Sequence, residues 1–299
     1  MNMKNFYHIF ANGSDARNFI TSRSDMEYQF NLVAVSALSS GAAVIAFSIE
    51  DTHPHILVYG EETECRKYLE TYEMSTKRHI ARTRGDMDST EFSLTMYLVE
   101  SPDYLKNVAS YIIVQPTKDG KRIMPYDYFW GSGSLYFRTG RHIPLWLRDD
   151  NGNLLEARKY ADIPIGERRQ ITRSSVVIPD GWLICQHLIL PENYVKVQLF
   201  EEIYGTPNCF RAFSAAGRKS MENVMDTMAR NRGVIVDDLE ARNIMKSLCR
   251  ELYGKDTART LGLDERLVVA RELGRRYRLS RRQIAILVRL PKSEVEKYL

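Results

Sequence analysis

The residues of this sequence that could do chemistry fall in two separate places. His53 and His55 stand one residue apart at the start of an apolar run, and Tyr111 and Gln115 stand four apart further along. Neutral imidazoles are common ligands of divalent metals, and an amide oxygen can complete such a set. A phenol beside that metal could attack a phosphodiester whose oxygen the metal polarises. The two pairs together therefore suggest a three-ligand metal site with a tyrosine nucleophile.

The histidine pair requires a strand to position it. Residues 44–58 hold two short apolar runs around a polar break, which predicts two paired β-strands with a tight connection. His53 and His55 begin the second strand, where side chains two residues apart point to the same face. Both imidazoles should therefore leave one side of the sheet. A His-x-His at a strand end also arises by chance, so the metal interpretation depends on the second pair.

The tyrosine pair requires a helix. Residues 103–115 have helical character, and Ser101 followed by Pro102 is a typical start signal. A helix here must end near Pro116, because proline disfavours helical geometry in the residue before it. Tyr111 and Gln115 then share one face at the helix C-terminus. An ordinary amphipathic helix would give the same spacing, which is the alternative interpretation.

The remaining pattern in the first half predicts the fold. A strand is expected at residues 5–11, helices at 24–40 and 61–85, and another strand at 91–99. The resulting β-α-β-β-α-β-α order predicts an α+β fold, a ferredoxin-like antiparallel sheet with helices on one face. His8, in the first strand, is interpreted as structural or DNA-lining rather than as a metal ligand.

Tyr72 is a rival for the role of nucleophile. It lies in the long helix predicted at residues 61–85, with Thr76 four residues later in place of an amide or an acid. A metal site like the one at Tyr111 would therefore lack its third ligand. We interpret Tyr72 as a packing residue.

Taken in order, these residues resemble the His-hydrophobic-His (HUH) single-tyrosine transposases, and within them the REP-associated tyrosine transposases. The likeness spans residues 5–137 and rests on a linked set of short motifs. These are Leu98-Val99-Glu100-Ser101, Tyr104-Leu105, Tyr111-Ile112, Gln115-Pro116, Gly120 and Tyr128-Phe129-Trp130-Gly131-Ser132. Two positions depart from the family: Pro54 separates the histidines in place of a bulky residue, and Gln115 stands where this branch commonly has Asn.

The resemblance implies an activity for residues 1–137. It implies an HUH nuclease domain in which Tyr111 attacks single-stranded DNA and forms a 5′-phosphotyrosine. It also implies Mg²⁺ or Mn²⁺ held by His53, His55 and Gln115, with hairpin-forming repeats as substrate. The expected activity is cleavage and rejoining of DNA, of the kind used in transposition.

Basic residues cluster in the long helix at residues 61–85. The first predicted DNA contacts are Arg78, Arg82 and Arg84. Basic residues near a helix C-terminus are also favoured by the helix dipole, so a solvated helix end is the alternative. The resemblance favours phosphate contact, because the matching helix of the family lies against DNA.

The rest of the chain divides into two further parts. Residues 138–216 are interpreted as a connector of unclear fold, with no visible chemistry. Residues 217–299 become helical and end in three segments that resemble a helix-turn-helix, with Ala285 at a close helix crossing and Val295 as an apolar anchor. A plain three-helix bundle is the alternative. The second set of predicted DNA contacts is Arg275, Arg276, Arg281 and Arg282.

Composition narrows the class of protein. The chain has 299 residues, 44% of them hydrophobic, which favours folded domains over disorder. No apolar run approaches the ~20 residues that cross a bilayer, and the N-terminus lacks a signal region. The four cysteines have no C-x2-C spacing, so zinc and disulfides are not indicated. We expect a cytoplasmic protein with no membrane partner, and the net charge of +4 permits nucleic acid.

Three functions are compatible with these sequence features. The first is a metal-dependent enzyme that cleaves and rejoins single-stranded or hairpin DNA. The second is a catalytically retired, DNA-binding regulator derived from a transposase, and the third is a metal phosphoesterase unrelated to DNA joining. Metal-dependent cleavage would separate the first from the second, and a covalent adduct would separate it from the third. A homodimer is left open.

Overall fold

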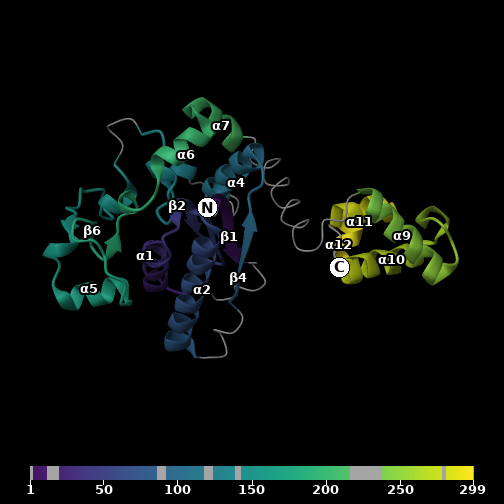
Figure 1. Ribbon diagram of the computed structural model, residues 1–299, viewed down its shortest axis with the longest axis horizontal. Coiled ribbons are helices and arrows are strands. Elements are labelled where there is room, and N and C mark those ends of the chain that lie inside the picture. Colours follow the sequence, from purple (N-terminus) through teal and green to yellow (C-terminus); the bar gives the residue numbers. More distant parts are fainter. Residues whose placement is uncertain are drawn as a thin grey trace. The chain divides into compact units, whose positions relative to one another are not determined.

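The chain forms two compact units, Met1–Ser220 and Met221–Leu299 (Figure 1). The computed structural model describes residues 3–11, 20–85, 92–117, 124–138, 143–215, 238–277 and 281–298. Together these residues give a mixed α+β chain, as the sequence predicts.

A four-stranded antiparallel sheet is the centre of the first unit. Its strands are β1 Asn5–Ala11, β2 Ala43–Ile49, β3 Pro54–Gly60 and β4 Leu94–Leu98, in the order β2-β3-β1-β4. All neighbouring strands are antiparallel, and the order places β3 and β1 at the two central positions. The predicted hairpin at residues 44–58 is confirmed as β2 and β3.

Helices α1, Arg23–Ser40, and α2, Glu62–Arg84, lie side by side (Figure 1). Ser22 caps α1 by accepting a hydrogen bond from the Asp25 backbone, and α1 ends where Gly41 takes a left-handed conformation. The Tyr68 hydroxyl donates to the Val33 carbonyl, which joins the two helices. Both predicted helices are therefore present, close to their predicted bounds.

Helix α4, Pro102–Val114, begins at Ser101, whose side chain accepts from the Tyr104 backbone. It lies on the sheet face opposite α1. Neighbouring strand residues alternate in direction, so Phe47 and Ser48 point to opposite faces. Phe30 of α1 contacts Phe47 at a ring-centroid distance of 5.6 Å, and Tyr111 of α4 contacts His55, the register partner of Ser48. The expectation of helices on one face is therefore wrong: the sheet is buried on both sides.

The segment at residues 128–132 protects the outer edge of β2. The Ile49 amide donates to the Trp130 carbonyl at 3.0 Å, which extends the sheet pattern beyond the strand. Gly131 favours this close approach, because an added Cβ would lie only 3.2 Å from the Phe47 carbonyl oxygen. A covered strand edge cannot pair with another chain, so the segment at residues 128–132 has a structural role.

The predicted connector packs against α1 as part of the first unit. The buried Asn31 side chain donates to the carbonyls of Ile171 and His187 at 3.1 and 2.7 Å, and accepts from the Ile189 amide at 2.8 Å. These bonds satisfy an otherwise costly buried amide. The elements of this part are β5 Arg158–Lys159, α5 Ile165–Thr172, β6 Leu183–Cys185, β7 Leu188–Ile189, α6 Val197–Tyr204 and α7 Pro207–Ala215.

The second unit is a bundle of α9 Asp238–Tyr253, α10 Leu263–Tyr277, α11 Arg281–Val288 and α12 Lys292–Tyr298. Its core contains the fully buried Leu248, Leu273, Ile284 and Val295. The three helical segments predicted at the end of the chain are confirmed as α10, α11 and α12. Short 3-10 turns complete the two units: Gln115–Thr117, Pro125–Asp127, Gly133–Leu135, Leu145–Leu147, Tyr160–Asp162, Pro191–Asn193 and Ala258–Thr260.

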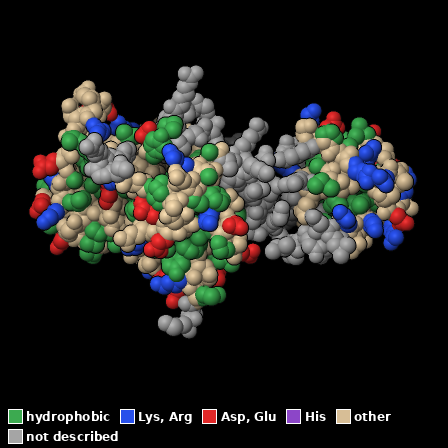
Figure 2. Space-filling model, turned by 90° about the horizontal axis from the view of Figure 1, so that it is seen from above, with side chains coloured by type: hydrophobic (Ala, Val, Ile, Leu, Met, Phe, Trp, Pro, Cys, Tyr) green, Lys and Arg blue, Asp and Glu red, His purple; other side chains and the backbone are tan. Residues whose placement is uncertain are grey.

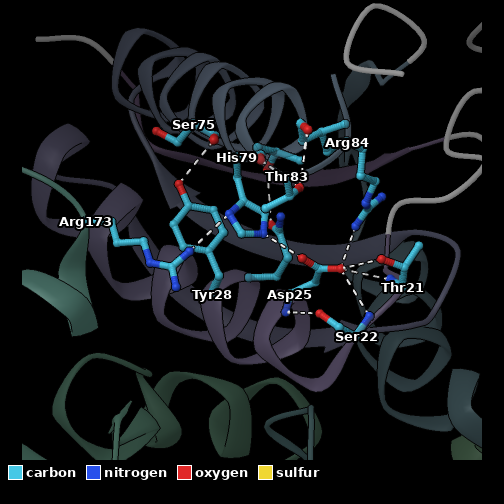
Figure 3. A network of polar contacts seen from close by, with 12 residues as sticks. Thr21, Ser22, Asp25, Tyr28, Ser75, His79, Thr83, Arg84 and Arg173 are labelled. Carbon is cyan, nitrogen blue, oxygen red and sulfur yellow. Dashed lines mark hydrogen bonds and ion pairs between the residues drawn. The ribbon is translucent and has the colours of Figure 1, made fainter. Parts of the chain in front are cut away.

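A buried polar network joins α1 to α2 (Figure 3). One carboxylate oxygen of Asp25 accepts from His79 Nε2 at 2.7 Å, and the other accepts from Arg84 at 2.5 Å and from the Thr21 backbone and hydroxyl. Burial alone would raise the pKa of Asp25, but these hydrogen bonds and the Arg84 charge hold it well below its usual range. Arg173 donates to the other ring nitrogen of His79 at 3.3 Å. The network therefore ties α1, α2 and the end of α5 together.

We expect Asp25→Asn to lower the free energy of unfolding by about 3 kcal/mol at pH 7, as when one partner of a buried ion pair is removed. A carboxyl with a lowered folded pKa stabilises fully above its unfolded pKa of ~3.9 and loses this contribution as pH falls. Burial also lowers the pKa of His79, so the free energy of unfolding falls further as the pH drops below ~6.5. Urea unfolding at pH 7, 5 and 3.5 should show both proteins losing stability on acidification, because both contain His79, and the gap between wild type and variant should narrow only as the pH falls to ~3.9 and below.

The matched control is Glu27→Gln, which removes a surface ion pair between Glu27 and Arg23 on the same helix. It should cost less than about 0.5 kcal/mol, because exposed i,i+4 pairs contribute little. Equal losses in the Asp25 and Glu27 variants would contradict a structural role for the network.

None of the helices among the described residues combines the length and the apolar character needed to cross a membrane.

Candidate active site

The four residues predicted to do chemistry come together on the α4 face of the sheet. The rings of His55 and Tyr111 meet edge to face at a centroid distance of 5.2 Å. The amide nitrogen of Gln115 lies 2.9 Å from His55 Nε2, and the His53 ring lies 4.7 Å from the His55 ring. His55, Tyr111 and Gln115 are buried, and His53 is half-buried. Residues far apart in the sequence thus form one compact cluster.

The local structure explains how Tyr111 and Gln115 reach His55. Gln115 is the C-cap of α4, and its backbone amide donates to the Tyr111 carbonyl, so both side chains leave the last turn. His55 is the second residue of β3 and pairs with Ser48 on β2 and Phe10 on β1. A central strand and the end of its covering helix therefore fix the two halves of the site.

His53 stands just before β3, in the turn from β2. The Glu50 amide donates to the His53 carbonyl at 3.1 Å, and the Thr52 hydroxyl lies 2.6 Å from His53 Nδ1. Pro54 opens the strand, where its missing N–H is tolerated. The proline between the histidines is thus compatible with the hairpin, and it leaves both rings on the same side.

His8 also belongs to this cluster, although the sequence indicates only a structural or DNA-lining role for it. Its Nε2 lies 3.1 Å from His55 Nδ1, the two rings stack at 5.3 Å, and the side chain is fully buried. Its ring also lies 6.1 Å from that of Tyr111. The signal that would have placed it is the β1–β3 register, which pairs Phe10 with His55 and so puts His8 on the same face.

Burial favours the neutral forms of Tyr111 and His8. It raises the pKa of Tyr111 to about 12, although a hydrogen bond with Gln115 partly offsets the shift. It lowers the pKa of His8 to about 3, and the nearby His53 adds to the effect. At neutral pH the site therefore presents a protonated phenol and, at His8, an uncharged imidazole.

The donor set fits a divalent cation if Gln115 takes part. Among the described residues, no group of three or more His, Cys, Asp or Glu side chains is arranged to hold a metal. His53 and His55 would supply two nitrogens and Gln115 one oxygen, a mixture better suited to Mn²⁺ than to Mg²⁺. The hydrogen bond between Gln115 and His55 Nε2 uses the lone pair that a metal needs. Metal binding would therefore open this bond and turn the amide oxygen inward.

The rival Tyr72 lies away from this cluster. It is fully buried on α2 and stacks on Tyr68 at 6.4 Å, and burial raises its pKa well above the usual value. This position agrees with its interpretation as a packing residue.

The basic residues of α2 do not join the cluster. Arg78 and Arg82 are exposed on α2, which packs against α1, and α1 lies on the sheet face opposite α4. Arg84 is held by Asp25 in the network of Figure 3, with 12% of its side chain exposed. We therefore leave Arg84 out of the residues expected to contact DNA, because its charge already serves the fold.

The second basic set lies in the C-terminal unit, where Lys and Arg side chains are visible on the surface (Figure 2). Arg281 is exposed at the start of α11, and Arg275 is exposed but pairs with Glu272 at 3.1 Å. The side chains of Arg276 and Arg282 lie outside the described part of the structure. Only Arg281 and Arg275 can therefore be placed.

A comparison with known proteins finds no family model, no curated protein and no solved structure that matches this chain. A proposal of function therefore rests on this protein's own sequence and site geometry. The geometry defines a buried tyrosine and amide at a helix end, facing His55 on a central strand and His53 in the turn before that strand. This arrangement can place a nucleophile beside a metal-bound phosphate.

Proposed function

We propose that this protein cleaves and rejoins single-stranded DNA through a covalent bond to Tyr111. The observation that carries the proposal is the convergence of Tyr111 and Gln115 with His53 and His55 on one face of the sheet. Neither pair alone is specific, because both spacings arise by chance. Their meeting in space is the property that a metal-assisted tyrosine nucleophile requires.

The fold supports the same proposal. In this proposal the strand order β2-β3-β1-β4 corresponds to a ferredoxin-like arrangement, in which α1 joins the parallel strands β1 and β2 and α2 joins the parallel strands β3 and β4. The motifs at residues 98–132 resemble those of the REP-associated tyrosine transposases. In this proposal α4 is the helix that aims the nucleophile, and residues 1–137 of the first unit form an HUH nuclease domain.

The reaction follows from the groups present. The Tyr111 oxygen attacks phosphorus, the bond from phosphorus to the 3′ oxygen breaks, and a 5′-phosphotyrosine and a 3′-hydroxyl result. The phenol loses its proton, and the leaving 3′ oxygen gains one. A divalent cation held by His53, His55 and Gln115 would place positive charge against a non-bridging phosphate oxygen. The phosphodiester energy is kept in the new bond, so attack by a 3′-hydroxyl reverses the step.

The covalent product tests the proposal. Purified protein, a hairpin-forming single-stranded oligonucleotide and Mn²⁺ should give a protein–DNA band on a denaturing gel, and EDTA should prevent it. A label at the 3′ end should travel with the protein and a label at the 5′ end should not, because Tyr111 would be joined to the downstream fragment. Turnover of small diesters without an adduct would instead identify a phosphoesterase.

A second candidate is a DNA-binding regulator that no longer cleaves. Its support is the closed state of the site: Tyr111 is 3% exposed and Gln115 blocks a lone pair of His55. Such a protein would bind hairpin DNA with or without a metal and would form no adduct. The gel assay therefore separates the two candidates.

The C-terminal unit is proposed to supply part of the DNA affinity through α11 and α12. Arg281→Ala should weaken binding to hairpin DNA about equally for all sequences and lower the salt slope by about 1, because one phosphate contact is lost. The control is Arg250→Ala on α9, where the guanidinium pairs with Asp256. Fluorescence anisotropy at several salt concentrations measures both. An unchanged slope for Arg281→Ala would assign this bundle to protein contacts or to scaffolding.

A further inference from the structure

His8 is the buried polar group of the site that the proposed reaction does not use. It lies on β1 with its Nε2 3.1 Å from His55 Nδ1. Its own Nδ1 is buried and has no hydrogen-bond partner among the described residues. An unsatisfied buried polar atom costs about 1–3 kcal/mol, so its presence calls for an explanation.

The hydrogen bonds around His55 assign its tautomer. The Gln115 amide nitrogen can only donate, so the His55 Nε2 that it faces at 2.9 Å carries the lone pair. A neutral imidazole with a bare Nε2 has its proton on Nδ1, which then donates to His8 Nε2. His8 in turn must carry its proton on Nδ1, the atom without a partner. One chain of donors and acceptors thus runs from Gln115 through His55 to His8.

We propose that His8 is a positioning residue, which accepts the Nδ1 proton of His55 and so keeps the lone pair of His55 Nε2 directed toward Gln115. The use of that lone pair as a metal ligand rests on the proposed function, whereas the tautomer does not. Histidines that bind metals commonly donate their second nitrogen to a fixed acceptor, which sets ring orientation and basicity. Here a neutral imidazole fills the place often taken by a carboxylate or a carbonyl.

The neighbouring Phe10 separates this role from simple packing. Both His8 and Phe10 place a ring against His55, at centroid distances of 5.3 and 5.8 Å. Only His8 offers a hydrogen-bond acceptor to it. A packing role predicts similar effects from changing either residue, and a positioning role predicts an effect on the His55 tautomer from His8 alone.

Nitrogen NMR on metal-free full-length protein with ¹⁵N-labelled histidine tests the inference. Wild type and Phe10→Leu should show His55 protonated at Nδ1. His8→Phe should move His55 toward the Nε2-protonated form, and His8→Gln should restore the original form, because its amide oxygen can take the place of Nε2. His55 protonated at Nε2 in wild type would overturn the inference, and that result needs no variant to fold.

Calorimetry with Mn²⁺ gives the second readout. His8→Phe should weaken Mn²⁺ binding by about 10- to 100-fold, the usual effect of losing an outer-shell partner, and Phe10→Leu should not. Equal weakening in both variants would overturn the positioning role. Wild type with the expected tautomer and no Mn²⁺ binding would support the positioning role and defeat the proposed function, so the two failures are distinct.

Discussion

Tyr111→Phe is expected to abolish the covalent protein–DNA product while leaving the fold intact. The substitution removes one oxygen from a ring that is 3% exposed and keeps the packing against His55. Loss of the hydrogen bond with Gln115 should cost about 1 kcal/mol, which a folded unit tolerates. No phenylalanine can attack phosphorus, so the band on the denaturing gel should disappear. Unchanged circular dichroism and unfolding midpoint would show that the loss is chemical.

Two other tyrosines serve as matched controls for this experiment. Tyr104→Phe alters a residue two turns earlier on the same helix, and Tyr72→Phe alters the buried rival on α2. Both variants should keep the adduct. An adduct that survives Tyr111→Phe and vanishes with Tyr72→Phe would mean that the chemistry is right and the nucleophile is on another helix.

The burial of Tyr111 also sets a pH dependence. Its pKa is raised to about 12, so the phenol is almost fully protonated at neutral pH. Attack requires loss of this proton, and a higher pH increases the reactive fraction. Adduct formation should therefore speed up from pH 7 to pH 9 in single-turnover reactions.

His55→Ala is expected to remove Mn²⁺ binding. The residue contributes a buried imidazole and is the histidine that faces Gln115 directly. Loss of one of three protein ligands leaves too few donors for useful affinity, and calorimetry should show no heat of binding. In wild type, affinity should fall on acidification, because an imidazole must lose its proton before it can bind a metal.

The control for this variant is His187→Ala, an exposed histidine outside the cluster. It should bind Mn²⁺ as wild type does. Gln115→Ala should weaken binding without abolishing it, since water can replace an amide oxygen. Equal binding by wild type and His55→Ala would remove the proposed metal site.

The elements that hold the site could be predicted because their signals are local. Ser101 and Pro102 mark the start of α4 and Pro116 marks its end, so the shared face of Tyr111 and Gln115 follows from helix geometry alone. Alternating apolar residues likewise indicate the hairpin that carries His53 and His55. Each half of the site is encoded within about fifteen residues of sequence.

The features that could not be predicted depend on contacts between distant segments. The role of His8 follows from the pairing of β1 with β3, which no local pattern specifies. Arg84 looks like a surface charge until Asp25 is seen to bind it across two helices. The same applies to Asn31, whose bonds to residues 171–189 make the apparent connector part of the first unit. These interactions are fixed by register and packing, not by composition.

The most direct test of the central claim is to locate the covalent bond in the wild-type protein. After reaction with hairpin DNA and Mn²⁺, nuclease and trypsin digestion should leave a nucleotide on the peptide of residues 107–118, whose single tyrosine is Tyr111. Tandem mass spectrometry should place the added phosphonucleotide on this tyrosine. An adduct on any other residue, or no adduct with any hairpin substrate, would contradict the central claim.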